Sequence, residues 1–222
     1  MRESRKLIVC YVTDRRSLLS PRATTESEAA LVQQIDAAVR AGVDWVQIRE
    51  KDLPARSLLD LTRAAIRTCA PPGRPGRARI LVNDRMDVAW AAGAGGVHAT
   101  ETSLPIPALI EARRASGRAD FLVGASCHSL RRVESAAAEG ADYVFFGPVF
   151  ATPSKAEFGP PQGLAALAEA CKAVSIPVLA IGGITLETCR ACADAGAAGV
   201  AAIRPFQQSR DLPEIVARLR AP

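Results

Sequence analysis

The segment AGVDWV at residues 41–46 carries the pattern that decides the fold of this chain. The same pattern returns as AGAGGV at 92–97, EGADYV at 139–144 and AGAAGV at 195–200. A glycine just past a helix suits the left-handed C′ position, and the valine that follows suits a buried strand. The glycines at 42, 93, 140 and 196 recur at a spacing of about 50 residues, which fits two strand–helix units.

Short apolar runs between these signals predict eight strands, at 7–13, 45–49, 79–83, 96–99, 121–126, 143–147, 177–182 and 199–203. Amphipathic segments separate them, for example at 57–69, 129–140 and 163–174. Continuous apolar strands that alternate with helices indicate a parallel sheet covered by helices. Eight such units predict an α/β fold, a (β/α)₈ TIM barrel, and we expect residues 1–222 to form a single domain.

A doubly wound sheet is the alternative that the same alternation leaves open. Such a sheet usually has fewer strands and a first turn with the pattern G-x-G-x-x-G. The first predicted strand is followed here by VTDRRS at 12–17, which lacks that pattern. The barrel is therefore the favoured architecture.

Length and composition set the class of the protein. The chain has 222 residues, of which 49% are hydrophobic, so it can bury a sizeable core. No apolar run reaches the roughly 18 residues of a membrane span. The short apolar run near the N-terminus is interpreted as the first strand rather than a signal peptide. We therefore expect a cytoplasmic protein with no membrane partner, and the sequence leaves a homo-oligomer open.

Charge and cysteines narrow the partners. The net charge of +5 favours anionic substrates such as phosphates. The basic segment at 71–79 has no interleaved aromatic residues, so we interpret it as a solvated loop and expect no nucleic-acid partner. Cys189 and Cys192 form a CxxC, but they lie in an alanine-rich helical segment without a second pair, which predicts packing rather than zinc or redox chemistry.

Polar residues collect where the predicted strands end, whereas the strand starts hold little beyond small, apolar and turn residues. In chain order the strand ends carry Thr13 and Asp14, residues 47–52, Asn83 and Asp84, His98, Ser126 and His128, the loop at 149–162, Gly182 and Gly183, and Arg204. The C-terminal ends of the strands form the active-site face of such barrels. This asymmetry predicts a small-molecule site, most simply that of an enzyme.

Three residues of the second strand end alternate in sequence: Gln47, Arg49 and Lys51. Side chains of one parity share a direction while a strand lasts. Arg49 and Lys51 could clamp an anion there, and Gln47 could bind the edge of a heterocycle. A solvated charged turn is the alternative.

Two further segments suit phosphate. Gly182 and Gly183 offer backbone N–H groups just before a helix that we expect at Thr185, although a tight turn alone would also need small residues. Thr152, Ser154 and Lys155 bring two hydroxyls and an ammonium group to the loop after the sixth strand. That loop is long for such a connection, which predicts a lid.

Asp84 has two interpretations that the residues do not separate: it could bind Mg²⁺, or it could cap a helix that begins at Met86. His98 and His128 are the only histidines. A lone histidine at a strand end is more often a hydrogen-bonded structural residue than a general base. The sequence has no zinc-ligand spacing and no nucleophile elbow.

In order and spacing, several motifs resemble the thiamine phosphate synthase / TenI superfamily. These motifs are QIREKD, VNDRMDVA, GVH, GASCHS, GADYVFFGPVFAT-x-SK, VLAIGGIT and AGAAGVAA. The resemblance covers nearly the whole chain and implies a phosphate-binding (β/α)₈ barrel. It also implies a transferase of thiamine biosynthesis that joins an aminopyrimidine methyl diphosphate to a thiazole phosphate and releases pyrophosphate.

The resemblance assigns a role to each matching position. It implies that Arg49, Lys51, Asn83 and Lys155 contact the diphosphate, and that Gln47 and Ser126 lie on the pyrimidine side, with Arg49, Lys51, Ser126 and Lys155 expected to be catalytic. Thr152, Ser154, Gly182 and Gly183 match the thiazole phosphate site. Asp84 matches one of two Mg²⁺ ligands, so the resemblance implies Mg²⁺ as cofactor.

Two other functions within the same superfamily remain as alternatives. One is a TenI-like thiazole tautomerase, whose acid–base histidine would align with Pro148; the Gly-Pro here is typical of synthases. The other is a catalytically degenerate homologue that only binds a phosphate ligand.

The segment GGVHATETSLP at 95–105 departs from the family pattern. The second Mg²⁺ ligand of synthases, an aspartate, aligns with Ser103, and a family glutamine aligns with Glu101, which we expect to serve as the metal ligand instead. At the eighth strand the usual small, serine-containing segment is replaced around Arg204, which could bind phosphate or fill the pocket.

Overall fold

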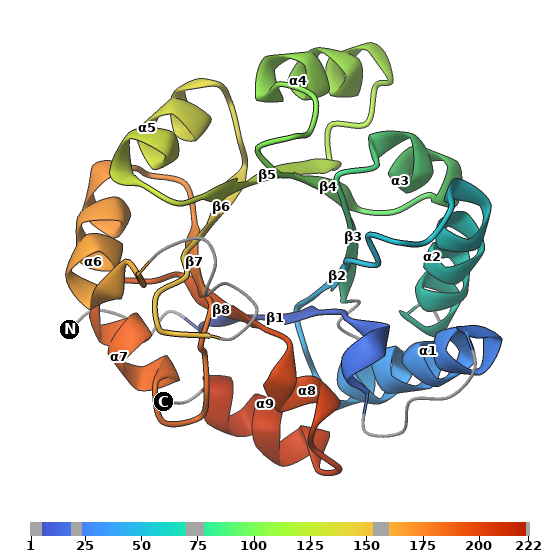
Figure 1. Ribbon diagram of the computed structural model, residues 1–222. Helices are drawn as coiled ribbons and strands as arrows, with labels where there is room; N and C mark the ends of the chain where they lie inside the picture. The colour runs from blue at the N-terminus through green and yellow to red at the C-terminus, as the bar shows by residue number, and fades with distance from the viewer. Residues whose placement is uncertain (1–5, 19–23, 70–77, 153–159, 221–222) are drawn as a thin grey trace.

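The computed structural model describes residues 6–18, 24–69, 78–152 and 160–220. These residues form a closed barrel of parallel strands surrounded by helices (Figure 1). The strands are β1 (Ile8–Val12), β2 (Trp45–Ile48), β3 (Arg79–Asn83), β4 (Gly96–Ala99), β5 (Leu122–Cys127), β6 (Tyr143–Phe146), β7 (Val178–Ile181) and β8 (Gly199–Ala202). Each strand pairs with the next along the chain, and β8 pairs with β1. The barrel prediction is confirmed, and this closure excludes the doubly wound sheet.

The helices cover the outside of the barrel. They are η1 (Arg15–Ser17), α1 (Thr24–Ala41), α2 (Ala55–Cys69), α3 (Met86–Ala92), α4 (Ile106–Ala115), α5 (Leu130–Ala138), α6 (Gly163–Ala173), α7 (Cys189–Asp194), α8 (Arg204–Gln207) and α9 (Leu212–Arg220). The predicted helical segments at 57–69, 129–140 and 163–174 coincide with α2, α5 and α6.

The helix expected at Thr185 begins instead at Cys189. The Thr188 hydroxyl accepts a hydrogen bond from the Thr185 amide at 2.8 Å, and the Thr185 hydroxyl accepts from the Thr188 amide at 3.3 Å. Threonine hydroxyls that bond the local backbone hold it in turns and compete with the helix.

The glycines of the repeated pattern have the predicted left-handed conformation. Gly42, Gly93, Gly140 and Gly196 have φ of 98°, 77°, 94° and 98°. Each follows a helix and directs the chain into the next strand, so the sequence repeat marks one helix-to-strand corner in every second unit.

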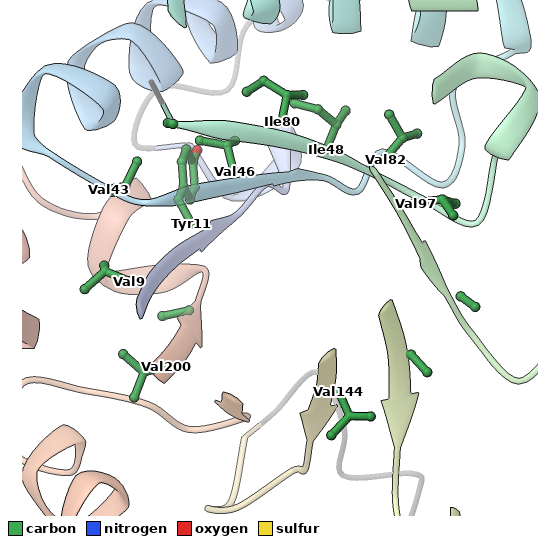
Figure 2. Close-up of a cluster of buried hydrophobic side chains, with 14 of the residues drawn as sticks. Val9, Tyr11, Val43, Val46, Ile48, Ile80, Val82, Val97, Val144 and Val200 are labelled. Carbon is green, nitrogen blue, oxygen red and sulfur yellow. The ribbon is translucent and has the colours of Figure 1, made fainter. Parts of the chain in front are cut away.

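Alternation along each strand separates two apolar cores. Outward-facing residues such as Val9, Tyr11 and Val46 pack between the strands and the helices (Figure 2). Inward-facing residues fill the barrel itself with a second cluster: Cys10, Val12, Leu81, Tyr143, Phe145, Leu179 and Ala201. The inner cluster makes the barrel a packed core rather than a pore, so a ligand must bind above it, at one end.

The strand starts carry polar contacts that the sequence did not predict. Two aspartates of the repeated pattern bind backbone amides and arginines there. Asp44 accepts a hydrogen bond from the Val9 amide at 2.9 Å and pairs with Arg220 at 3.0 Å. Asp142 accepts from the Val123 amide at 2.7 Å and pairs with Arg113 at 2.6 Å. Each carboxylate accepts a hydrogen bond from a backbone amide near the start of a neighbouring strand, which explains an acidic residue at that point of the repeat.

Cys189 and Cys192 are buried in α7 with free thiols, as the packing interpretation predicts. Burial raises the pKa of both thiols, that of Cys192 to about 12, so neither is poised for thiolate chemistry. In the described part of the chain, no helix is both long enough and apolar enough to cross a membrane.

Candidate active site

The end of β2 carries the predicted cationic residues. Gln47 is buried, and its side-chain amide donates to the Asn83 side chain of β3 at 3.2 Å. Beyond it, Lys51 has a lowered pKa, mainly because the positive charge of Arg49 lies nearby and partly because of burial, while Asp84 acts in the opposite sense. The charges of Arg49, Lys51 and Asp84 are therefore close enough to influence one another, as an anion clamp requires.

A buried ion-pair network fixes the backbone beneath this clamp. The Arg49 amide donates to the Thr13 hydroxyl at 2.9 Å, and that hydroxyl donates to Glu50 at 2.6 Å. Arg15 donates to Glu50 at 3.0 Å and also pairs with Asp52. Because Glu50 and Asp52 alternate with Arg49 and Lys51, the acidic residues bond to η1 and leave the cations to the site. The motifs did not predict this network, although the alternation of basic and acidic residues at 49–52 is a signal for it.

The pKa values of the two carboxylates beside Arg15, those of Glu50 and Asp52, are shifted in opposite directions. Arg15 lowers the pKa of Asp52, which lies near the surface. Burial raises the pKa of Glu50 despite the bonds from Thr13 and Arg15. The difference follows from solvent: Glu50 is 5% exposed and pays the full cost of desolvation.

Asp84 binds the turn after β4 rather than the following helix. Its carboxylate accepts a hydrogen bond from the Ser103 hydroxyl. Helix α3 has Arg85 at its N-cap position and no side-chain cap bond, so the capping interpretation of Asp84 is wrong. Among the described non-glycine residues, Asp84 alone has a positive φ, of 65°. Strained backbone of this kind concentrates at functional sites.

The polar segment after β4 is a hydrogen-bonded turn. The Thr100 amide donates to the Ser103 hydroxyl at 2.7 Å, and the Ser103 amide donates to the Thr100 carbonyl at 3.2 Å. Glu101 is exposed at the tip of this turn. Within the described ranges, no three histidine, cysteine or acidic residues gather closely enough to hold a metal by themselves.

His98 and Ser126 come together at the ends of β4 and β5. His98 is 1% exposed, with Nε2 at 3.0 Å from the Ser126 hydroxyl and Nδ1 at 3.1 Å from the Tyr143 hydroxyl. Burial, and to a lesser degree the charge of Arg49, lowers the pKa of His98 to about 3. His98 is therefore a neutral structural residue, as predicted, and His128 likewise contacts the Gly147 carbonyl through Nδ1.

Gly182 and Gly183 form a tight turn against the loop after β6. A Cβ atom at Gly182 would lie 2.5 Å from the Pro148 Cβ, and one at Gly183 would lie 2.6 Å from the Phe150 Cβ. Their φ angles are 91° and 67°. Both positions require glycine, and the turn leaves backbone rather than side chains at this part of the rim.

Arg204 extends from the start of α8 to the same loop. Its guanidinium donates to the Thr152 hydroxyl at 2.8 Å, so two predicted phosphate-binding residues meet. Arg204 is exposed, which contradicts a role in filling a buried pocket. Ser154 and Lys155 lie outside the described residues, as does most of the predicted lid.

The predicted residues thus form two groups at one end of the barrel. The first joins β2 to β5 through Gln47, Arg49, Lys51, Asn83, Asp84 and Ser126. The second joins β6 to β8 through Thr152, Gly182, Gly183 and Arg204. The first group offers Arg49 and Lys51 and the second offers Arg204, so each group has a cation that suits an anionic ligand.

Known proteins are similar to this chain in sequence. The family model described as thiamine monophosphate synthase matches residues 17–206. A thiamine-phosphate synthase of Anaeromyxobacter dehalogenans is 46% identical over 86% of this chain and 82% of its own length. One of Roseiflexus castenholzii is 40% identical over 88% of this chain and 79% of its own length.

Solved structures of known proteins have the same fold as this chain. A thiamine phosphate pyrophosphorylase from Pyrococcus furiosus superposes with a TM-score of 0.79 at 30% identity, covering 98% of this chain and 95% of its own. A 3-hexulose-6-phosphate synthase superposes with a TM-score of 0.67 at 19% identity, covering 97% of this chain and 99% of its own, which shows the shared barrel alone. The chain belongs to the thiamine monophosphate synthase family.

Proposed function

We propose that the protein couples an aminopyrimidine methyl diphosphate to a thiazole phosphate, giving thiamine phosphate and pyrophosphate. The observation that carries this function is the cationic pair Arg49 and Lys51 beside the carboxylate of Asp84. Three relatives at 40–46% identity bear the name thiamine-phosphate synthase, which supports the same reaction.

The group at β2–β5 is proposed to bind the pyrimidine diphosphate. Arg49 and Lys51 bind its phosphate oxygens, together with Asn83 and Lys155. Gln47 lies two residues before Arg49, inside β2, where it is buried and hydrogen-bonded to Asn83. Its side-chain amide can bind the edge of a heterocycle there. Ser126 faces the same region from β5.

The group at β6–β8 is proposed to bind the thiazole phosphate. Gly182 and Gly183 are proposed to offer backbone N–H groups to the phosphate, and their missing side chains let this turn pack against the loop after β6. Arg204 adds a guanidinium beside the Thr152 hydroxyl, with Ser154 completing the set.

The residues around Asp84 fit Mg²⁺. The donors there are hard oxygens: the exposed Asp84 carboxylate, the Ser103 hydroxyl bonded to it, and Glu101 on the same turn. Mg²⁺ is usually held by one or two carboxylates together with substrate phosphates and water, so a site with few protein ligands suffices. When bound, the ion would neutralise charge on the diphosphate.

The reaction requires groups that stabilise the leaving diphosphate, and it does not require a general base. The bond from the pyrimidine methyl carbon to the diphosphate oxygen breaks, and the thiazole nitrogen forms a new bond to that carbon. Arg49 and Lys51 stabilise the negative charge that grows on the diphosphate. His98, the imidazole bonded to Ser126, is buried and neutral with both nitrogens in hydrogen bonds, so it is unsuited to take a proton.

Incubation of the purified chain with both substrates and Mg²⁺ tests the proposal, with thiamine phosphate measured by chromatography. Lys51→Met is expected to lower kcat by about 100-fold, the usual loss for one group that stabilises developing charge. Lys172→Met is the matched control, because Lys172 is exposed in the last turn of α6.

Absence of thiamine phosphate at high enzyme concentration would refute the synthase. Turnover of a thiazole carboxylate phosphate tautomer alone would identify the tautomerase instead, and tight phosphate binding without turnover would identify a degenerate homologue. Both substrates are small phosphorylated molecules. The cytoplasmic location stays a prediction from the sequence, and the homo-oligomer stays open.

A further inference from the structure

A buried line of hydrogen bonds crosses three strands beneath the site. It runs from the Tyr143 hydroxyl on β6 to His98 Nδ1 on β4 at 3.1 Å, and from His98 Nε2 to the Ser126 hydroxyl on β5 at 3.0 Å. Tyr143 and His98 are each 1% exposed, whereas Ser126 is half-buried at the open end of the line. Only Ser126 can meet a ligand.

The sequence builds this line with a glycine and aromatic rings. A Cβ atom at Gly124 would lie 2.0 Å from the Tyr143 ring, so the missing side chain makes room for it. The imidazole of His98 packs against the ring of Phe145 at a tilt of 36°, with ring centroids 4.3 Å apart. The three polar groups are therefore held by packing as well as by their hydrogen bonds.

The neutral imidazole carries one N–H, so its tautomer decides which way the line points. In the described part of the chain, His98 Nδ1 is the hydrogen-bond partner of the Tyr143 hydroxyl. If Nδ1 were the donor, the hydroxyl hydrogen of Tyr143 would be buried among apolar rings without an acceptor. A buried donor without a partner costs more than an oxygen with an unused lone pair, so Tyr143 donates to Nδ1.

We infer that Tyr143 and His98 are positioning residues that fix Ser126 as a hydrogen-bond donor to the substrate. Tyr143 donates to Nδ1, the proton of His98 resides on Nε2, and Nε2–H donates to the Ser126 oxygen. The remaining hydrogen of Ser126 then points into the site, toward an accepting atom of the ligand. No proton is transferred, and the line only sets the direction of the bonds.

The role of Ser126 toward substrate rests on the proposed function, but the tautomer does not. The chain has two histidines, so the full-length protein labelled with ¹⁵N-histidine gives two sets of imidazole signals. The set that Tyr143→Phe perturbs belongs to His98. A protonated Nε2 and an unprotonated Nδ1 are expected, and a protonated Nδ1 would overturn the inference whatever the enzyme does.

Kinetics test the positioning role. Tyr143→Phe is expected to lower kcat by about fivefold to tenfold, the effect of one misdirected hydrogen bond. In a Ser126→Ala background the same change is expected to cost nothing more, because the line then has no end group to direct. Additive losses would show a merely structural tyrosine and would also overturn the inference.

Tyr11→Phe is the matched control. Tyr11 and Tyr143 are the two tyrosines, and Tyr11 also buries its hydroxyl, which accepts from Gln207 at 3.2 Å on the outer side of the barrel. Its loss is expected to lower stability and leave kcat unchanged. The affinities of pyrophosphate alone and of the pyrimidine alcohol alone are measured for Ser126→Ala and for the unchanged protein. The ligand that supplies the acceptor is expected to bind Ser126→Ala more weakly. Unchanged affinity for both ligands would overturn the donor role.

Discussion

The Ser103 hydroxyl donates a hydrogen bond to the carboxylate of Asp84 and so ties the turn after β4 to the end of β3. The same serine oxygen accepts from the Thr100 amide, which closes the turn. Ser103 therefore orients Asp84 without adding charge. The family resemblance implies an aspartate, the second Mg²⁺ ligand, at the position of Ser103, where this chain has a neutral hydroxyl.

Ser103→Asp is expected to lower the Mg²⁺ concentration for half-maximal activity by about tenfold, because a second carboxylate raises affinity for a hard cation. Calorimetric titration of the substrate-free variant with Mg²⁺ checks binding separately from turnover. Thr102→Asp is the matched control, since it adds the same charge to an exposed neighbour in the turn. Equal Mg²⁺ affinity in the two variants would contradict the proposed metal position.

Glu101→Gln is expected to raise the Mg²⁺ concentration needed for activity while leaving kcat at saturating Mg²⁺ nearly unchanged. The reason is the loss of one carboxylate on the turn that holds Asp84. Glu111→Gln on α4 is an exposed control. An unaltered Mg²⁺ dependence in Glu101→Gln would exclude Glu101 as a ligand.

The barrel could be predicted because its signals are local. A glycine that leaves a helix and an apolar run that follows it are set by backbone sterics and burial, as Gly42 and Val46 illustrate. The start of α7 was mispredicted because Thr185 and Thr188 bond the backbone ahead of the helix. Such competition depends on side-chain geometry that periodicity does not reveal.

The cationic residues of the site could be predicted from the sequence, but the hydrogen-bond partners that hold the site in place could not. Arg49 and Lys51 stand out by charge at a strand end, whereas the partners of Glu50 and His98 lie 35 and 45 residues away in the chain. Contacts of that range are fixed by strand register, for instance Ser126 opposite Phe145. Register emerges only when the barrel closes.

Asp52→Asn tests the ion-pair network through pH. The lowered pKa of Asp52 means that its charged form stabilises the fold above its ordinary pKa near 4, and that this stabilisation is lost as pH falls through the lower folded value. The variant is expected to lose roughly 1 kcal/mol at pH 7, allowing for solvent screening, and less below about pH 4. Urea unfolding at both pH values measures this.

Asp60→Asn provides the comparison for that experiment, because Asp60 forms an exposed pair with Arg56 on α2. It is expected to change the free energy of unfolding little at either pH. A loss in Asp52→Asn that stays constant across the pH range would mean that packing, and not the charge beside Arg15, accounts for the effect.

Arg204→Ala is expected to raise KM for the thiazole phosphate by about tenfold and to leave KM for the pyrimidine diphosphate unchanged, because the contact described for Arg204 is to Thr152, in the β6–β8 group. Arg204→Lys keeps the charge but loses the planar fork, so it should recover only part of the affinity. Arg67→Ala, in the last turn of α2, is the exposed control. Steady-state kinetics with each substrate varied in turn decide the matter. If both KM values rose together, Arg204 would act through the shape of the whole rim, and the separation of the site into two anion-binding groups would fail.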